Sequence, residues 1–355
     1  MIQILIGAKV FYAENLEKLI SNMGIAKPTI MTAVPRFYQN LFTKININFE
    51  KQKGLKKLLI SKTLDLGKKM LNKNEMTFFE KIQNFICQIL VRKKIRNQFG
   101  GNLQAFVSGG GALDKNVGEF LNAIGLPTLQ GYGLTETSPV VSCNLPNLVK
   151  VDTVGPPFRN NEVRIASDGE ILIRGENVML GYWNQQEATQ EVLKNGWLHT
   201  GDIGVLEEDG SLRITDRKKD IIVNSGGDNI APARVEGVIT VEPEFLQAMV
   251  YGDKKPYLVG VVVPSEAFIE EWCKGEGNKI TLSDLSADKD FNGAVQGVMS
   301  RVNSRLSQIE KVRHIIVADE PFTTENGLMT PTLKIKRHKI LQNYKQKLES
   351  LYRRP

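Results

Sequence analysis

The chain of 355 residues lacks the patterns that mark disulfide-rich, metal-binding and membrane-spanning proteins. Its three cysteines, Cys87, Cys143 and Cys273, are odd in number and far apart, so they offer neither a disulfide framework nor metal-ligand spacing. The apolar run over residues 1–6 soon meets Lys9, and no later run approaches the length of a membrane crossing. We therefore expect a cytoplasmic protein in a reducing compartment, with peripheral membrane association as the only membrane contact.

Acidic residues are scarce between residues 51 and 96, where the excess of positive charge is concentrated. The whole chain has 46 Lys and Arg against 39 Asp and Glu, a formal charge of +7. Residues 51–96 contain 13 basic and three acidic residues, a surplus of ten, so the remainder of the chain is slightly acidic. No aromatic interleaving or known binding motif accompanies this charge, which argues against nucleic acid as a partner.

The basic stretch also contains apolar residues at helical spacing between Leu55 and Leu71. One interpretation is a helix with solvated lysines and an apolar stripe that packs in the core. The alternative is a basic amphipathic helix that lies on an anionic membrane surface. Peripheral membrane contact through residues 51–96 therefore stays open.

Apolar strands alternate with helices in the first 150 residues. A helix is predicted over residues 13–23, and strands are predicted over residues 28–35, 103–111 and 126–130. This alternation predicts an α/β domain with parallel crossovers. Residues 151–218 then show short strands separated by turns, which predicts a β-rich subdomain, and a mixed α/β pattern resumes beyond it.

Two glycine turns, Gly109–Gly111 and Gly131–Gly133, follow predicted strands. At the carboxyl ends of parallel strands, missing side chains let a flat ligand approach the backbone. Directly after the second turn, the Thr135 hydroxyl can bond a phosphate oxygen and the Glu136 carboxylate suits Mg²⁺. The ordinary alternatives are a helix N-cap and an acidic first-turn residue.

Three later segments carry candidate binding residues. Asp202 lies in a Thr-Gly-Asp sequence, where a carboxylate can accept two hydrogen bonds from a diol such as ribose, although turn aspartates are common. The turn at Gly226–Gly227 precedes a helix predicted to begin near Pro232. The segment MTPTLKIKR carries Lys334 and Lys336, with a basic surface helix as the alternative interpretation.

The order of these segments resembles that of a known family. The chain is similar to the adenylate-forming enzymes through the segments QGYGLTETS (130–138), WLHTGD (197–202), TDRKKD (215–220) and MTPTLKIKR (329–337). The segments AKVFYAEN (8–15) and KPTIMTAVPR (27–36) are similar to the long-chain acyl-CoA synthetase branch.

This resemblance implies an α/β protein that corresponds to the carboxy-terminal portion of the adenylate-forming enzyme fold. Residues 1–218 would be an AMP-binding domain truncated at its amino terminus, with an α/β sheet subdomain (1–150) and a small β-rich subdomain (151–218). Residues 219–355 would be a mobile α+β carboxy-terminal domain, with its hinge at Lys219. The family places a Ser/Thr/Gly-rich phosphate loop ahead of these motifs, and none occurs between Met1 and Gln130. We therefore expect part of a longer enzyme, or one of two polypeptides of which the other carries the missing part.

The resemblance also assigns roles residue by residue. Lys334 would be the catalytic lysine, with Lys336 as its rival, while Thr135 and Glu136 would contact the α-phosphate and Mg²⁺ respectively. Tyr132 would offer a stacking face to the nucleotide base. The nucleotide-binding residues would be Gly109, Gly110, Gly111, Gln130, Gly131, Tyr132, Gly133, Asp202 and Arg217, and Gly226 and Gly227 would border the tunnel for coenzyme A.

These roles predict a long-chain fatty acid–CoA ligase that uses ATP, Mg²⁺ and coenzyme A. It would activate a fatty acid to acyl-AMP and then form the thioester with CoA. Two alternatives stay open. The chain could be an inactive remnant or a partner-dependent half that binds nucleotide or CoA, or a ligase that makes acyl-AMP or loads an acyl carrier protein.

Overall fold

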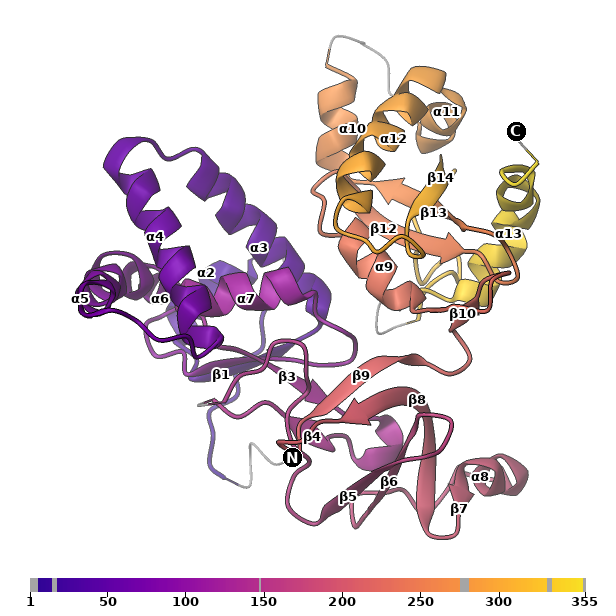
Figure 1. The fold of residues 1–355 in the computed structure, drawn as a ribbon, viewed down its shortest axis with the longest axis horizontal. Helices are drawn as coiled ribbons and strands as arrows, with labels where there is room; N and C mark the ends of the chain where they lie inside the picture. Colours follow the sequence, from indigo (N-terminus) through magenta and orange to yellow (C-terminus); the bar gives the residue numbers. More distant parts are fainter. Residues whose placement is uncertain (1–5, 15–17, 147, 275–280, 331–333, 354–355) are drawn as a thin grey trace. The chain divides into compact units, whose positions relative to one another are not determined.

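The computed structural model describes residues 6–14, 18–146, 148–274, 281–330 and 334–353, which form two compact units (Figure 1). The first unit comprises residues 1–200 and 205–214, and the second comprises residues 201–204 and 215–355. Each unit has its own hydrophobic core.

A mainly parallel sheet forms the first part of the first unit. Its strands, in spatial order, are β1 (Ile30–Ala33), β2 (Ala105–Ser108), β3 (Thr128–Tyr132) and the short antiparallel β4 (Ser142–Cys143). The register pairs Ala33 with Ser108 and Ser108 with Gln130, so the carboxyl ends of the three parallel strands lie at one edge. The predicted α/β architecture with parallel crossovers is confirmed.

Helical segments connect these strands. They are α2 (Leu19–Ala26), α3 (Pro35–Glu50), α4 (Gly54–Leu71), α5 (Phe78–Cys87), the π-helix η1 (Gln88–Arg92), α6 (Lys93–Gln98), α7 (Lys115–Ala123) and the 3₁₀ turn η2 (Thr135–Thr137). The helix predicted from residue 13 begins later, at Leu19. The Glu14 backbone N–H donates to Asn22 Oδ1 over 3.0 Å, so its partner is a side chain rather than a helical carbonyl. None of the helices in the described ranges is long and apolar enough to cross a membrane.

Helix α4 uses its central turns to bury apolar surface. Leu66 is 1% exposed and Thr63 is fully buried, and the helix packs against α7. Leu55, near its amino end, is 82% exposed. The interpretation of residues 55–71 as a helix with a core-facing stripe therefore holds for the middle of α4, while the first turn remains open to solvent.

The second part of the first unit is β-rich, as predicted. Its elements are β5 (Asn161–Ile165), β6 (Glu170–Gly175), α8 (Gln186–Val192), β7 (Leu193–Lys194), β8 (Trp197–Leu206) and β9 (Leu212–Arg217). The sheet order is β5-β6-β8-β7, with β9 also paired to β8. Ile171, Ile173, Leu198 and Leu212 form its core.

The second unit is an α+β domain. Its elements are β10 (Ile222–Val223), β11 (Asn229–Ile230), α9 (Pro232–Ile239), β12 (Phe245–Tyr251), β13 (Leu258–Pro264), α10 (Glu266–Trp272), α11 (Leu282–Ala287), α12 (Lys289–Asn303), β14 (Val312–Val317) and α13 (Arg337–Ser350). Strands β12, β13 and β14 form one sheet, in which β13 is antiparallel to β12 and parallel to β14.

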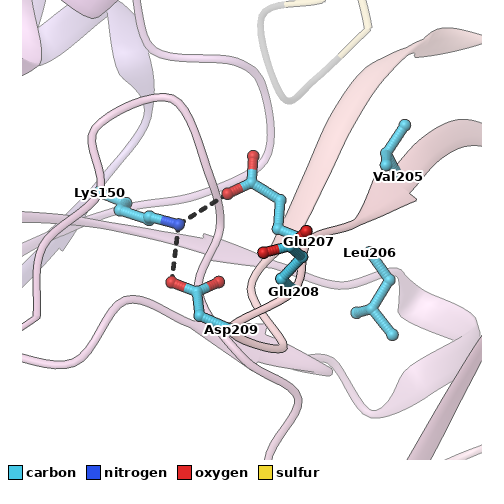
Figure 2. Close-up of a pocket in the computed structure, with 6 residues that line it drawn as sticks. All are labelled: Lys150, Val205, Leu206, Glu207, Glu208 and Asp209. Atoms are coloured by element: carbon cyan, nitrogen blue, oxygen red, sulfur yellow. Dashed lines mark hydrogen bonds and ion pairs between the residues drawn. The ribbon is translucent and has the colours of Figure 1, made fainter.

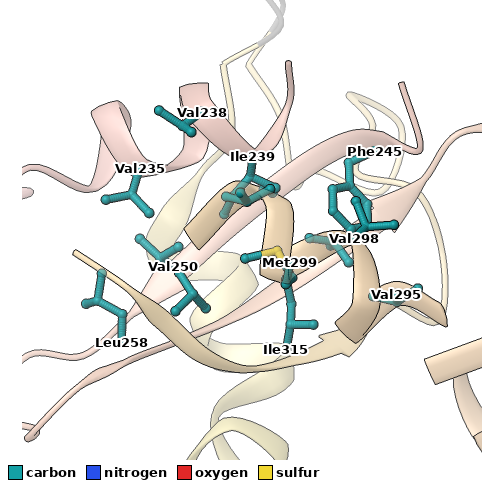
Figure 3. Close-up of a cluster of buried hydrophobic side chains, with 14 of the residues drawn as sticks. Val235, Val238, Ile239, Phe245, Val250, Leu258, Val295, Val298, Met299 and Ile315 are labelled. Carbon is teal, nitrogen blue, oxygen red and sulfur yellow. The ribbon is translucent and has the colours of Figure 1, made fainter. Parts of the chain in front are cut away.

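Strand β13 is buried on both faces. Leu258 and Val262 face a cluster that includes α9 and α12 residues, part of which Figure 3 shows. Val259 and Val261 face the opposite cluster, which includes residues of α13. Alternate residues of a strand point to opposite faces, so a continuous run of valines is what a sheet covered by helices on both sides requires.

A buried charged cluster joins three elements of the second unit. Arg337, the first residue of α13, donates to both carboxylate oxygens of Glu236 on α9 over 2.7 and 2.8 Å, and to the Val250 carbonyl on β12. Val250 in turn donates its N–H to Glu236. Burial raises the pKa of Glu236, and the Arg337 charge opposes that shift. The cluster satisfies most of its polar groups, as an interior charge requires.

Asp216 lies near this cluster and is only 8% exposed. Its Oδ1 accepts from the Arg217 N–H over 2.6 Å, while Oδ2 has no hydrogen-bond partner among the described residues. Burial raises the pKa of Asp216 to about 6, and the negative charge of Asp220 adds to that shift. The ionised carboxylate is therefore disfavoured in the folded protein.

Removing the buried leucine of α4 should destabilise the protein far more than removing its exposed neighbour. We expect Leu66→Ala to lower the free energy of unfolding of the first unit by about 2–5 kcal/mol, because it leaves a cavity. The matched Leu55→Ala change, at an 82% exposed position, should alter it by less than about 0.5 kcal/mol. Denaturant unfolding measures both changes. Similar losses of unfolding free energy in the two variants would show that Leu66 is not packed in the core.

Stability of the second unit should carry a signature of Asp216 in its pH dependence. Because the pKa is higher folded than unfolded, the contribution of Asp216 is complete below about pH 4 and is lost as the pH rises through about 6. Asp216→Asn should therefore gain stability relative to the parent protein as the pH rises over that window. Thermal unfolding at several pH values measures the difference.

Asp284 provides a control of opposite sign in the same unit. Hydrogen bonds from the Thr281 side chain and backbone lower its pKa, so its contribution is present at neutral pH and is lost on acidification. Asp284→Asn should thus lose relative stability as the pH rises. If the stability of both variants, relative to the parent protein, changed with pH in the same direction, the raised pKa assigned to Asp216 would be contradicted.

Candidate active site

The two predicted glycine turns lie next to each other at the edge of the parallel sheet. A Cβ placed on Gly109, after β2, would lie 3.9 Å from the Gly131 carbonyl oxygen at the end of β3. The Gly109 N–H donates to the Ala33 carbonyl over 3.2 Å, which connects the first turn to β1 as well. The structure therefore brings both turns to the carboxyl ends of the strands, where ligands bind in open α/β sheets.

Gly133 is required by a close backbone approach. A Cβ on Gly133 would lie 1.7 Å from the Pro139 carbonyl oxygen, so no side chain fits there. The turn must fold back on itself at this point, and it directly precedes η2, which carries Thr135 and Glu136. The glycine thus sets the position of the two predicted phosphate and metal contacts.

Two predicted nucleotide contacts point their side chains into the protein. Gln130 is buried and accepts from the Leu113 N–H through Oε1, while its side-chain amide donates to the Val151 carbonyl. Tyr132 is 7% exposed and packs in the β-rich core beside Val141. The stacking role expected of Tyr132 stays a prediction, and in this structure its ring packs in the β-rich core. Through these contacts, Gln130 and Tyr132 support the Gly131–Gly133 turn from the side of the protein interior.

Glu136 is half-buried and has a partner that sequence reasoning missed. The Tyr182 hydroxyl donates to Glu136 Oε1 over 2.8 Å, from a position 46 residues further along the chain. Partial burial and the Glu136 carboxylate raise the pKa of Tyr182 to about 12, so the hydroxyl stays protonated. No sequence signal links the two, since they meet only through the fold.

The Glu136 carboxylate fits a Mg²⁺ site completed by water and substrate phosphates better than a metal site built only from protein side chains. Among the residues that the structure describes, no three His, Cys, Asp or Glu side chains gather to hold a metal ion. Mg²⁺ commonly uses one or two carboxylates and completes its shell with water and substrate phosphates. A single glutamate beside a turn that is predicted to bind phosphate fits that mode, whereas a metal site built wholly from protein ligands does not fit.

The second unit gathers three predicted residues from distant parts of the chain. Arg217 donates through Nε to Asp202 Oδ1 over 2.8 Å, and the Asp202 side chain is 6% exposed. Desolvation lowers the pKa of Lys334, and the positive charge of Arg217 lowers it further, while Asp202 acts in the opposite direction. The three charged groups therefore lie within electrostatic reach of one another.

The backbone around Lys334 is held locally. The Thr330 N–H donates to the Lys334 carbonyl over 2.8 Å, and the Lys334 N–H donates to the Thr330 hydroxyl. Residues 331–333 lie outside the described ranges. Three residues after Lys334, Arg337 is bonded to Glu236, so the chain that follows the lysine is attached to α9.

Lys219 lies in an exposed turn over residues 218–220, immediately after β9. The Lys218 N–H donates to the Gly201 carbonyl over 2.8 Å, and the Asp220 N–H donates to the Arg217 carbonyl. The turn follows Arg217 directly. A change in the backbone dihedral angles of Lys219 would therefore occur two residues after the arginine that bonds Asp202.

The Gly226–Gly227 turn joins β10 to β11 and lines a pocket of about 430 Å³. Gly227 has φ of 87°, which strongly favours glycine. Asn224 Oδ1 accepts from the N–H groups of Gly226 and Asp228, both over 2.9 Å, and fixes the turn.

Two cations face the same pocket from the far end of the sequence. Lys311 and Arg313 both line it, and the Arg313 guanidinium lies 4.7 Å from the centre of the Tyr257 ring. Sequence reasoning missed this pair, because nothing in the local sequence connects β14 to the glycine turn. The pocket thus brings an aromatic ring and two cations together, with Asp228 also in its lining.

A larger hollow in the first unit contains none of the predicted residues. It encloses about 520 Å³ and is lined by Lys150 and residues 205–209 of the β8–β9 turn (Figure 2). Lys150 Nζ lies 2.7 Å from Glu207 Oε2 and 2.6 Å from Asp209 Oδ2, so carboxylates already neutralise this cation. The hollow is a surface ion-pair cluster rather than a second candidate site.

Comparison with known families matches both parts of the chain. The AMP-binding enzyme family matches residues 1–183, and the AMP-binding enzyme C-terminal domain matches residues 219–355. The chain is 33% identical over 344 residues to a long-chain-fatty-acid–CoA ligase of Mycobacterium bovis, covering 96% of this chain and 57% of that protein. It is 31% identical over 362 residues to long chain acyl-CoA synthetase 3 of Arabidopsis thaliana, covering 97% and 54%.

Solved structures share the fold. The adenylation domain of a carboxylate reductase from Mycobacterium chelonae superposes with a TM-score of 0.69 at 22% identity, covering 97% of this chain and 50% of that one. O-succinylbenzoate coenzyme A synthetase from Bacillus subtilis, solved with AMP, gives a TM-score of 0.58 at 22% identity, covering 95% and 56%.

The chain thus spans about half the length of the curated relatives that it matches. The predicted adenylate-forming fold is confirmed by these structures and by the two family matches. The chain belongs to the AMP-binding, adenylate-forming enzymes, and over most of its length it is similar to long-chain fatty acid–CoA ligases.

Proposed function

We propose that the chain takes part in the ATP-dependent activation of a long-chain fatty acid and its transfer to coenzyme A. The observation that carries the proposal is the grouping of Asp202, Arg217 and Lys334 in one unit, although they are separated by up to 132 positions in the sequence. The relatives named long-chain-fatty-acid–CoA ligases supply the substrate class.

In the first unit, binding of the nucleotide base is assigned to the edge of the parallel sheet. In the second unit, a ribose contact is assigned separately to the Asp202–Arg217 pair. The adjoining turns at Gly109–Gly111 and Gly131–Gly133 let a flat purine approach the backbone. The Asp202 carboxylate accepts hydrogen bonds from the ribose diol, and Arg217 holds that carboxylate in orientation. Thr135 donates to the α-phosphate from the exposed side of η2.

Lys334 is assigned to the adenylation step. In that step a fatty carboxylate oxygen attacks the α-phosphorus of ATP, an acyl-phosphate bond forms, and pyrophosphate leaves. Negative charge builds on the α-phosphate oxygens, and the Lys334 ammonium stabilises it. Lys334 is exposed, so a bound phosphate can reach its ammonium.

Glu136 is assigned to Mg²⁺, and Tyr182 is the residue that orients its carboxylate. When bound, the ion would neutralise charge on the phosphates. Tyr182 leaves the second carboxylate oxygen of Glu136 to the metal, since its hydroxyl bonds Oε1.

The second step is assigned to the pocket beside Gly226–Gly227. In that step the CoA thiol attacks the acyl carbonyl, the thioester forms and AMP leaves, while the pocket is assigned to the binding of CoA. Lys311 and Arg313 suit the phosphates of CoA, and the glycine turn admits the narrow pantetheine arm. The exposed turn at Lys219 is assigned as the hinge that alternates the two steps.

Measuring adenylation and thioester formation separately distinguishes a specific role of Lys334 in the first step from a general loss of structure. With palmitate, ATP and Mg²⁺, we expect Lys334→Ala to slow pyrophosphate release about 100-fold or more, because it removes charge stabilisation in the transition state. Thioester formation from synthetic palmitoyl-adenylate and CoA should stay within a few-fold of the parent. Lys339→Ala, at an exposed position of α13, is the control.

Failure of that experiment would take distinguishable forms. A folded parent chain that releases no pyrophosphate, but still forms thioester, would indicate a half that needs a second polypeptide for adenylation. A folded parent chain that performs neither step and binds no AMP would overturn the proposal. Equal loss of both steps in Lys334→Ala would remove its assigned role.

The double change Lys311→Ala, Arg313→Ala tests the CoA pocket. We expect the KM for CoA in the thioester step to rise about tenfold, which corresponds to 1.4 kcal/mol of lost phosphate contacts. The KM for ATP should not change. Lys289→Ala, another exposed cation of the second unit, is the control, and an unchanged KM for CoA in the double variant would exclude the pocket.

A further inference from the structure

A group of exposed apolar side chains in the first unit lies on α5 and η1. Seven large apolar side chains of this segment are 42–75% exposed, namely Phe78, Phe79, Ile82, Phe85, Ile86, Ile89 and Leu90. We call these seven residues the α5 face. In Figure 1, α5 lies at the outer margin of its unit, beyond α4.

The seven residues occupy one side of the helix. Ile82, Ile86 and Leu90 follow one another at intervals of four, and Phe78, Phe85 and Ile89 fall beside them at intervals of seven and four. The segment from Phe78 to Leu90 is three to four turns long, about 20 Å. Such a continuous stripe is an amphipathic helix whose apolar side is turned outward.

The opposite side of the same helix anchors it firmly. Cys87 and Val91 are buried, and Arg92 is 4% exposed. Arg92 donates to the Ala123 carbonyl over 2.8 Å and to the Thr63 carbonyl over 3.1 Å, and its Nη1 donates to Asn84 on α5. The amino end is closed by a capping box between Thr77 and Glu80. The buried side of α5 and η1 therefore holds the exposed apolar side in a fixed position on the first unit.

Positive charge accompanies the α5 face. Lys93 and Lys94 are exposed and follow Ile89 and Leu90 by four residues each, so they continue the same side of the helix by one turn. Lys81 is exposed as well. The only acidic residue from Phe78 to Gln98 is Glu80, which is bonded to Lys69 over 2.5 Å.

We propose that the α5 face docks on an anionic phospholipid surface, with the helix lying in the plane of the interface. The phenylalanines and isoleucines enter the boundary between headgroups and acyl chains, and Lys93, Lys94 and Lys81 contact the lipid phosphates. Charge complementarity selects this occupant, since the face offers cations beside its apolar stripe and no carboxylate outside an ion pair. A second copy of the chain would bring the same lysines against each other.

The proposal places the membrane contact on α5 rather than on α4. The sequence suggested a basic amphipathic helix over residues 55–71, but the middle of α4 is committed to the core through Leu66. The outward stripe is the next helix, where lysines are fewer and aromatic residues more frequent. The inference is independent of the proposed reaction, because it rests only on this surface.

Vesicle binding tests the proposal. The full chain should bind vesicles of phosphatidylcholine with about 30 mol% phosphatidylglycerol at least about tenfold more tightly than phosphatidylcholine alone. The double change Phe78→Ser, Phe85→Ser should lose most of that binding. Lys93→Glu, Lys94→Glu should lose the preference for anionic lipid, and Trp183→Ser, which removes a 90% exposed aromatic elsewhere, should bind like the parent.

A tryptophan placed on the α5 face reports directly whether this surface contacts the lipid. Phe85→Trp should show tryptophan emission that shifts to the blue on vesicle binding and is quenched by brominated lipid, beyond the signal of the parent chain. The same quenching in Leu55→Trp but not in Phe85→Trp would move the contact to α4 and overturn the proposal.

Two other results would also overturn it. One is an absence of vesicle binding by a folded parent chain. The other is a concentration-dependent dimer in sedimentation that Phe78→Ser, Phe85→Ser dissociates, because the α5 face would then be an interface between copies.

Discussion

The bidentate ion pair between Glu236 and Arg337 is the interaction on which the second unit most depends. It joins α9, β12 and the start of α13 through one guanidinium, and it lies three residues from Lys334. A buried pair of this kind is costly unless its hydrogen bonds are satisfied, and here the Val250 N–H and carbonyl supply them. The segment that carries Lys334 is therefore attached to the core by this ion pair and also by apolar packing, since Leu328, Met329 and Ile335 pack in the cluster that includes α13.

The first unit depends on a different constraint, the register of its parallel strands. The pairing of Ser108 with Gln130 brings two glycine turns to the same edge, and the side chain of Gln130 supports the loops behind them. In the first unit, the turns that allow close backbone approach are thus set by strand pairing. The Asp202–Arg217 ion pair lies within the second unit.

A long-chain fatty acid is a membrane-soluble substrate, and the α5 face gives the proposed reaction a physical setting. Partition of the enzyme to an anionic surface would place it where its substrate concentrates. The α5 face also lies within residues 51–96, the stretch that carries the basic surplus of the chain.

Much of the site could be predicted from residue order alone. Glycine turns after strands, a Thr-Glu pair and a Thr-Gly-Asp sequence are local features, and their chemistry follows from residue type and spacing. The strands from residue 28 to residue 132 were found for the same reason, since alternation and proline or glycine boundaries are local signals. The roles of these residues remain predictions until they are measured.

Other features could not be predicted, because they arise from contacts between distant segments. The Tyr182 hydroxyl meets Glu136, Lys311 and Arg313 join a turn more than 80 residues earlier, and Tyr132 turns its ring into the β-rich core. The start of α2 was placed too early because Asn22 bonds back to Glu14. The sequence by itself determined the family, the alternation of strands and helices and the residue types at the site. Only the tertiary structure decided which apolar stripe is buried and which faces water, because α4 and α5 have similar periodicity and differ in what packs against them.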